Sequence, residues 1–96
     1  MTISKTRERS AHIRTALVEA ARTREVMLAD LSDSTEDHVI EVQRFNIECI
    51  LGEVRAALER LEDGSYGTCL SCRTPIPWER LELRPWAAFC IRCAGR

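Results

Sequence analysis

The sequence predicts a mostly α-helical protein, with an N-terminal antiparallel two-helix coiled-coil hairpin over residues 1–62 and a small four-cysteine module over residues 63–96. Three observations predict this fold class. No glycine or proline occurs between residues 4 and 30, and the whole chain has only four glycines and three prolines. Apolar residues recur at helical spacing through the first two-thirds. Five cysteines in 96 residues indicate a metal site or disulfides near the end of the chain.

The first predicted helix covers about residues 4–30. Its apolar or small residues recur in steps of three and four, which places them on one face, with Arg24 filling a gap in the series. The members of this stripe are Ile13, Leu17, Ala20, Met27 and Leu31. Residues 32–37 break the pattern and predict a tight turn, in which Asp33 with Glu36, or Ser34 with Asp37, resembles a capping box.

The second predicted helix covers about residues 35–61. Its apolar residues repeat every seven positions, and this repeat favours a partner helix in coiled-coil geometry. They are Ile40, Ile47, Val54 and Leu61, supported by Leu51 and Leu58. The short turn makes the first helix an antiparallel partner. Gly64 predicts the end of this helix, because glycine readily adopts the left-handed conformation after a helix.

Composition and charge exclude several function classes. The formal net charge is −1, which gives no argument for nucleic-acid binding from overall basicity. No apolar stretch is long enough for a signal peptide or a transmembrane helix, so a cytoplasmic location and no membrane partner are expected. Charge is nevertheless segregated along the chain, at +4 over residues 1–24, −8 over residues 25–63 and +3 over residues 64–96. This segregation suits either oriented docking on a charged partner or pairing of the two helices.

The cysteine spacing predicts one structural Zn²⁺ ion. Two C-x2-C pairs are separated by seventeen residues, and they supply four thiolates for a closed tetrahedral site: Cys69, Cys72, Cys90 and Cys93. Two disulfides, or a thiol–disulfide redox pair, are the alternatives. They are disfavoured because a reducing compartment keeps thiols free and because a redox C-x-x-C follows a strand. The fifth cysteine, Cys49, is expected to be a small buried apolar residue of the second helix.

The segment from Ala57 to Cys72, reading ALERLEDGSYGTCLSC, is followed by IPWERLELRP and Cys90-Ile-Arg-Cys93. Residues 57–93 closely resemble the DksA/TraR family of bacterial transcription factors, and the preceding hairpin matches in architecture only. The resemblance implies a zinc-binding regulator of RNA polymerase that makes no sequence-specific contact with DNA. Its coiled coil is expected to enter the secondary channel, with the zinc module at the rim.

The resemblance also implies that acidic residues at the coiled-coil tip, about residues 30–37, act near the polymerase active site. The candidates are Asp30, Asp33, Glu36 and Asp37. Carboxylates can contact cations there, but acids are equally common as solvated caps at a helix N-terminus, so both interpretations stay open. The best-known members carry an alanine two residues after the second aspartate, and this chain has Thr35 in that place. Its tip also lies about one helical turn, or roughly 5 Å, nearer the first cysteine.

Some family members work with guanosine tetraphosphate, and the corresponding positions are incomplete here. Arg84 matches a basic family position, whereas Glu53 and Ala94 stand where cations are expected. A carboxylate repels a pyrophosphate, so we expect no alarmone binding through this composite site.

Two other function classes remain as alternatives. The first is a zinc-finger adaptor that binds another protein or a nucleic acid, which the five arginines of the last third keep open. The second is a thiol-dependent enzyme. It is disfavoured, because a zinc ion saturated by four thiolates leaves no free nucleophile and no open coordination position.

Overall fold

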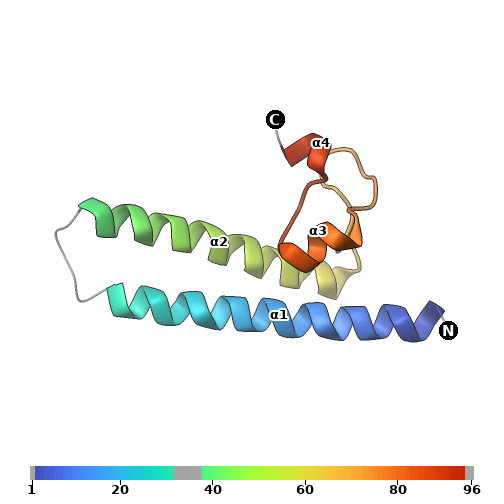
Figure 1. Cartoon of the computed structure of the whole chain (residues 1–96), viewed down its shortest axis with the longest axis horizontal. Coiled ribbons are helices and arrows are strands. Elements are labelled where there is room, and N and C mark those ends of the chain that lie inside the picture. Colours follow the sequence, from blue (N-terminus) through green and yellow to red (C-terminus); the bar gives the residue numbers. More distant parts are fainter. Residues whose placement is uncertain (1, 32–37, 95–96) are drawn as a thin grey trace.

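The computed structural model describes residues 2–31 and 38–94. Two long helices, α1 (Thr2–Leu31) and α2 (His38–Asp63), are followed by two short ones, α3 (Trp78–Leu83) and α4 (Ile91–Ala94). The molecule measures 53 × 29 × 21 Å. Figure 1 shows α1 and α2 side by side as an elongated hairpin, with α3 and α4 gathered over the C-terminal half of α2. The described ranges contain no strand, only an isolated antiparallel bridge between Thr68 and Pro75.

The predicted apolar stripes face each other between α1 and α2. Their central cluster is fully or almost fully buried and consists of Ile13, Leu17, Val54 and Ala57. Two ion pairs cross the same interface, Arg14 with Glu62 at 2.8 Å and Glu25 with Arg55 at 3.3 Å. Both pairs are solvent-exposed, so each contributes at most about 1 kcal/mol and the apolar seam supplies most of the hairpin's stability.

Both long helices end with a defined partner for their last carbonyl groups. At the end of α1, the Nη2 atom of Arg44 donates a 3.0 Å hydrogen bond to the carbonyl oxygen of Leu31, so a cation from α2 satisfies the α1 C-terminus. At the end of α2, the amides of Ser65 and Tyr66 donate to the carbonyl oxygen of Arg60 at 3.0 and 3.1 Å. Gly64 has a φ of +86°, which confirms the predicted left-handed termination.

The last third forms a second buried cluster beside the hairpin. It consists of Cys69, Ile76, Leu81 and Ala87. Tyr66 and Trp78 pack against both this cluster and the hairpin core, and Trp86 also packs against the hairpin. These aromatic residues therefore join the two parts of the molecule into one continuous apolar interior.

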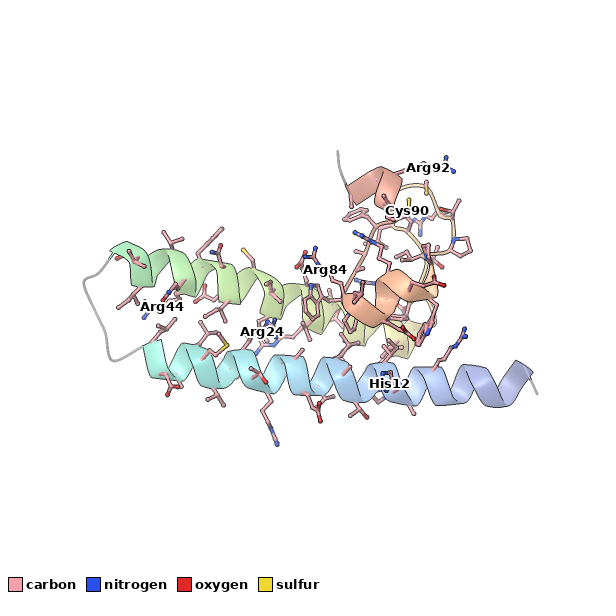
Figure 2. The ribbon with its side chains drawn as sticks, in the orientation of Figure 1. His12, Arg24, Arg44, Arg84, Cys90 and Arg92 are labelled. Atoms are coloured by element: carbon pink, nitrogen blue, oxygen red, sulfur yellow. The ribbon has the colours of Figure 1, made fainter. Side chains whose placement is uncertain are left out.

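Arginines of α1 reinforce this junction. The guanidinium of Arg9 lies 4.7 Å from the centroid of the Trp78 ring, and that of Arg24 lies 5.0 Å from the Trp86 ring. Figure 2 shows Arg24 between the two long helices, on the side of α1 that faces the module. Arg24 interrupts the predicted apolar stripe of the first helix. The structure shows that its guanidinium makes a cation–π contact with Trp86 at this position.

Two expectations about individual residues were wrong. Cys49 is exposed rather than buried, because it lies on the side of α2 that faces away from α1. Met27 is 43 % exposed, and Leu28 is the more buried of the two, because a helical period of 3.6 residues drifts away from strict steps of three and four. The predicted capping boxes of residues 33–37 lie outside the described residues. Within the described ranges, no helix is long and apolar enough to cross a lipid bilayer.

Candidate metal centre

The first cysteine pair lies on a tight turn between α2 and α3. The amide of Cys69 donates to the carbonyl oxygen of Thr74 at 2.9 Å, and the amide of Arg73 donates to the carbonyl oxygen of Cys69 at 3.0 Å. Arg73 has a φ of +66°, a left-handed conformation that lets the chain reverse within a few residues. This reversal brings Cys72 back beside Cys69, so both thiols point to the same side of the turn.

The second pair lies at the start of α4. The amides of Cys93 and Ala94 donate to the carbonyl oxygen of Cys90 at 3.1 and 2.8 Å, which holds the two cysteines one helical turn apart. A 2.9 Å hydrogen bond from the amide of Leu70 to the carbonyl oxygen of Ala88 connects the two turns. Backbone hydrogen bonds, together with the apolar cluster around Cys69, therefore bring the two cysteine pairs together.

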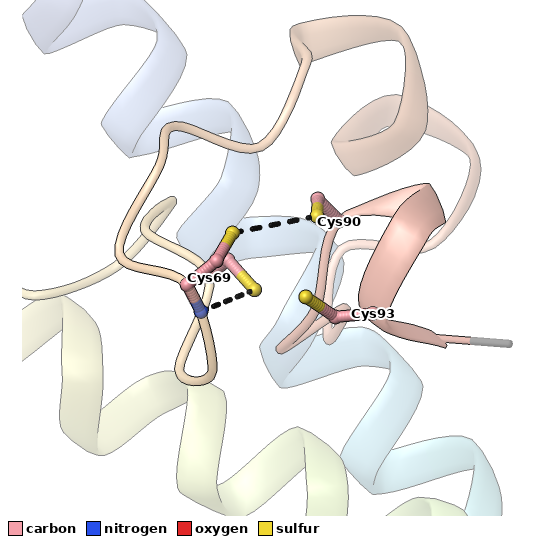
Figure 3. Close-up of side chains that lie close together, drawn as sticks. Cys69, Cys90 and Cys93 are labelled. Atoms are coloured by element: carbon pink, nitrogen blue, oxygen red, sulfur yellow. Dashed lines mark hydrogen bonds between the residues drawn. The ribbon is translucent and has the colours of Figure 1, made fainter. Parts of the chain in front are cut away.

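The four sulfur atoms form a compact group. The Sγ atoms of Cys69, Cys72, Cys90 and Cys93 all lie within 4.8 Å of one another. Those of Cys72 and Cys90 are 3.7 Å apart. Figure 3 shows Cys69 of the first pair facing Cys90 and Cys93 of the second. In a tetrahedral site with Zn–S distances of about 2.3 Å, neighbouring sulfurs are about 3.8 Å apart, whereas a disulfide would need about 2.05 Å. The thiols are free, so the geometry fits four ligands around one ion and not two disulfides.

Local hydrogen bonds prepare two of these thiols for the deprotonated state that metal binding needs. The backbone N–H of Cys72 points at the sulfur of Cys69 at 3.5 Å, and such contacts lower the pKa of Cys69 to about 6. A 2.9 Å contact with the Thr74 hydroxyl lowers the pKa of Cys72. The Ser71 hydroxyl lowers the pKa of Cys93, but the neighbouring Cys69 thiol, burial and the other thiols outweigh it and raise that pKa to about 11. Four thiolates this close repel one another, and a bound cation removes the repulsion.

The burial of the four cysteines is graded. Cys69 is fully buried, Cys90 and Cys93 are half-buried, and Cys72 is exposed at a shallow surface groove that Thr74 and Arg92 also line. All four coordination positions of a tetrahedral Zn²⁺ would be taken by sulfur, which makes the site structural. When bound, the ion supplies cross-links between the two turns and no Lewis-acid chemistry toward a substrate.

Comparison with known proteins agrees with this geometry. Residues 64–96 match the model of the prokaryotic dksA/traR C4-type zinc finger. The RNA polymerase-binding transcription factor DksA of Caulobacter vibrioides is 37 % identical over 70 residues, which cover 72 % of this chain and 49 % of that protein. General stress protein 16O of Bacillus subtilis is 39 % identical over 57 residues, covering 59 % of this chain and 32 % of that one.

The solved structures extend the similarity through the hairpin. Transcription factor DksA2 from Pseudomonas aeruginosa superimposes with a TM-score of 0.67 and 27 % identity, covering 93 % of this chain and 82 % of that chain. This chain belongs to the DksA/TraR family. An RNA polymerase binding protein and transcriptional regulator from Chlamydia trachomatis gives a TM-score of 0.62 at 28 % identity, covering 92 % of this chain and 85 % of that one.

The family match identifies the metal, and the comparisons show how much of the relatives this chain covers. The cofactor of this C4 zinc-finger module is zinc, and its four cysteines are positioned to bind one ion. The chain spans only about half, or less, of the length of the curated relatives that it matches. The division into a hairpin over residues 1–62 and a zinc module over residues 63–96 stays a prediction.

The other predicted site residues are not part of the sulfur cluster, and several of them lie outside the described residues. Asp30 is exposed in the last turn of α1. Asp33, Glu36 and Asp37 lie outside the described residues. Arg84 is exposed directly after α3 and lines a surface groove with Leu83. Figure 2 shows Arg84 on the side of the module that lies over α2.

Sequence reasoning missed the roles of two residues at the junction of the module and the hairpin. The hydroxyl of Tyr66 donates a 2.7 Å hydrogen bond to the carbonyl oxygen of Pro85, and burial raises its pKa to about 12. Arg60 is only 9 % exposed, and its Nη2 atom has no hydrogen-bond partner in the part of the chain described. The EDGSYG segment was a signal for Tyr66, but no local pattern distinguishes a buried arginine from an exposed one.

Proposed function

We propose that this chain is a transcription regulator that binds RNA polymerase and inserts its hairpin into the secondary channel. The relatives support the partner, since the Caulobacter protein is named an RNA polymerase-binding transcription factor and the Chlamydia structure is titled an RNA polymerase binding protein. Since RNA polymerase works in the bacterial cytoplasm, the proposal also places the chain there. It assigns no catalysis to the chain, because its metal centre offers no open position.

The observation that carries the proposal is the free arm of the hairpin. The zinc module packs against the part of α2 around Val54, Ala57 and Leu61, and the first half of α2 projects beyond it (Figure 1). About thirteen residues of α2, from His38 to Ile50, correspond to roughly 20 Å of two-helix rod. A narrow, helix-stiffened arm with a bulky module at its base is a shape that enters a channel and stops at its rim.

We propose that the arm acts through carboxylate side chains at its end. The carboxylate of Asp30 is exposed at the end of α1, with the predicted tip residues Asp33, Glu36 and Asp37 following it in the sequence. Carboxylates at the end of an inserted arm can form charge-assisted hydrogen bonds with arginines or lysines, or approach a bound divalent ion. In this proposal they alter the stability of the open promoter complex, and the protein makes no sequence-specific contact with DNA.

Binding and transcription measurements on purified core polymerase test this proposal. The zinc-loaded chain is expected to bind, and the double variant Asp30→Asn with Asp33→Asn is expected to bind comparably but lose its effect on transcription. Glu19→Gln is the matched control, because Glu19 is an exposed acid of α1 away from the tip. The absence of binding at micromolar concentration would refute the partner. An unchanged transcription effect in the double variant would refute the role of the tip.

One surface favours the alternative of a zinc-finger adaptor. Leu83 is 88 % exposed and Ile91 is 70 % exposed, and both line a groove with two arginines, Arg80 and Arg84, and one acid, Glu79. Exposed apolar side chains beside cations are suited to another protein's acidic segment. The double variant Leu83→Ser with Ile91→Ser separates the two functions. An adaptor would lose its partner, whereas the tip variants would leave an adaptor unaffected.

A further inference from the structure

The hairpin carries an exposed apolar stripe that its own packing does not use. On α2, Val42, Phe45, Cys49 and Gly52 follow one another in steps of three and four, so they lie along one face of the helix. We call these four residues the outer stripe. Phe45 is 64 % exposed and Val42 is 46 % exposed, and Cys49 and Gly52 are exposed as well. Because a hairpin core needs only the opposite face of α2, the outer stripe is free for a partner.

Carboxylates border the outer stripe on both sides. Glu41 and Glu48 lie one heptad apart along one border, and Glu53 lies on the other; all three are exposed. None of them forms an ion pair within the part of the chain that the structure describes.

The cations of α2 do not neutralise this border. Arg44 donates to the carbonyl oxygen of Leu31, and Arg55 pairs with Glu25 of α1. Arg60, the remaining arginine of α2, is buried near Tyr66. The outer stripe is therefore an apolar stripe with negative borders that the arginines of α2 itself do not neutralise.

Gly52 adds a geometric feature to the stripe. A side chain added there would meet no atom within 4 Å, so nothing inside the molecule requires a glycine. Glycine in a helix interior lowers stability by roughly 1 kcal/mol relative to alanine. The lack of a side chain at Gly52 leaves a shallow depression beside Cys49 and Phe45. A partner's backbone or a bulky side chain can approach the helix closely there.

We propose that the outer stripe is a docking surface for a basic, apolar-bearing segment of RNA polymerase. This inference rests on the proposed function and names the surface and the chemistry that the polymerase must present. A second copy of the chain is the wrong occupant. Two outer stripes packed together, in either relative direction, would bring their glutamate borders against each other, and facing like charges are destabilising. In a segment with lysine or arginine flanking apolar side chains, the apolar side chains can pack on the outer stripe and the cations can pair with its glutamate borders.

Cys49 supplies a direct test, because it is the cysteine outside the metal centre. The zinc-loaded chain is treated with N-ethylmaleimide, alone and with saturating core polymerase, and modification of Cys49 is followed by mass spectrometry. Docking through the outer stripe is expected to slow modification of Cys49 strongly. Affinity is then measured for Val42→Ala and Phe45→Ala, with Val26→Ala as the matched control, since Val26 is 55 % exposed on α1. We expect Phe45→Ala to weaken binding about tenfold or more and Val26→Ala to leave it unchanged.

Each outcome separates this inference from the proposed function. Protection of Cys49 together with selective loss in the stripe variants supports the docking surface. Polymerase binding with Cys49 reacting as fast as in the free chain would overturn the inference and leave the proposed function intact. Equal losses of polymerase affinity for Val42→Ala and Val26→Ala would also overturn it, because they would show that the polymerase contacts both helices alike and does not prefer the outer stripe. No polymerase binding at all would reject both.

Discussion

Arg24 of α1 and Trp86 of the zinc module form a contact that spans the two parts of the molecule, with the guanidinium 5.0 Å from the ring centroid. The Nη1 atom of the same guanidinium donates to the carbonyl oxygen of Ala20 at 3.1 Å, so the side chain is held in place while it meets the ring. The contact sets the module against the side of the hairpin and leaves the far half of the arm free.

Replacement of Arg24 by alanine is expected to lower the free energy of unfolding by about 1 kcal/mol, because it removes the cation–π contact and part of the packing of the arginine stem. Urea unfolding followed by tryptophan fluorescence measures this loss. Arg22→Ala is the matched control, since Arg22 is an exposed arginine of the same helix. Equal effects of the two substitutions would show that the contact with Trp86 contributes nothing to stability.

Stability should fall at high pH because of Tyr66. Its pKa is raised by burial from about 10 to about 12 in the folded chain, and its protonated hydroxyl donates to Pro85. The neutral form is favoured by folding, so this contribution is complete below pH 10 and is lost as the pH rises through about 12. Unfolding free energies measured from pH 9 to pH 12 should show a decline that is smaller in Tyr66→Phe. The same decline in both proteins would assign it to other groups.

Zinc removal should unfold the C-terminal third before the hairpin. The metal joins two turns whose own buried cluster is small, so folding there depends on the ion. Chelation is expected to change tryptophan fluorescence markedly, because Trp78 and Trp86 pack at the junction, and to reduce helical circular dichroism less.

Metal analysis of cysteine variants checks the ligand set. Cys69→Ser is expected to lose stoichiometric zinc, whereas Cys49→Ser should retain one ion per chain, since Cys49 lies outside the sulfur cluster. Acidification should release the ion, because protons compete for the thiolates. Full zinc retention in Cys69→Ser would contradict the four-cysteine centre.

Gly52→Ala should stabilise the free chain by about 0.5–1 kcal/mol, because the position is helical and an added Cβ meets nothing within 4 Å. Gly64→Ala should do the opposite. Its φ of +86° is strained for any residue with a Cβ atom. Thermal unfolding of the two variants compares them directly. Destabilisation by Gly52→Ala would show that an internal constraint on this glycine exists.

Guanosine tetraphosphate is expected not to bind through a composite site around Arg84. Of the positions compared with the family, Arg84 is exposed and cationic, whereas Glu53 is an exposed carboxylate and Ala94 carries no charge. Isothermal titration of the alarmone into the chain with polymerase present checks this. Binding that Arg84→Ala abolishes would contradict the expectation. Glu53→Lys tests whether the carboxylate is what prevents binding, since it replaces a charge that repels the pyrophosphate by one that attracts it.

Much of the fold follows from local patterns in the chain. The heptad of α2 identified Val54 as a core residue and the short turn made α1 its antiparallel partner, because an apolar face must be covered by the nearest available helix. Gly64 marked the end of α2 since few residues tolerate its backbone conformation. The metal centre was predictable for a similar reason, because C-x2-C spacing is itself a local geometric property.

Other features depend on contacts between residues distant in the sequence. Cys49 was expected inside and is outside, because burial depends on which face of α2 meets α1 and the module, and a single residue type does not reveal that. Arg60 is charged yet buried, and Tyr66 reaches Pro85 across nineteen positions.

The sequence by itself determined the helical hairpin, the end of α2 and the four-cysteine cluster, because short-range spacing and backbone preference decide each of them. Only the tertiary structure decided where the module sits, which arginines are engaged and which face of α2 is left open. These depend on the packing of one apolar surface against another, and that packing is settled only when the helices and the module meet.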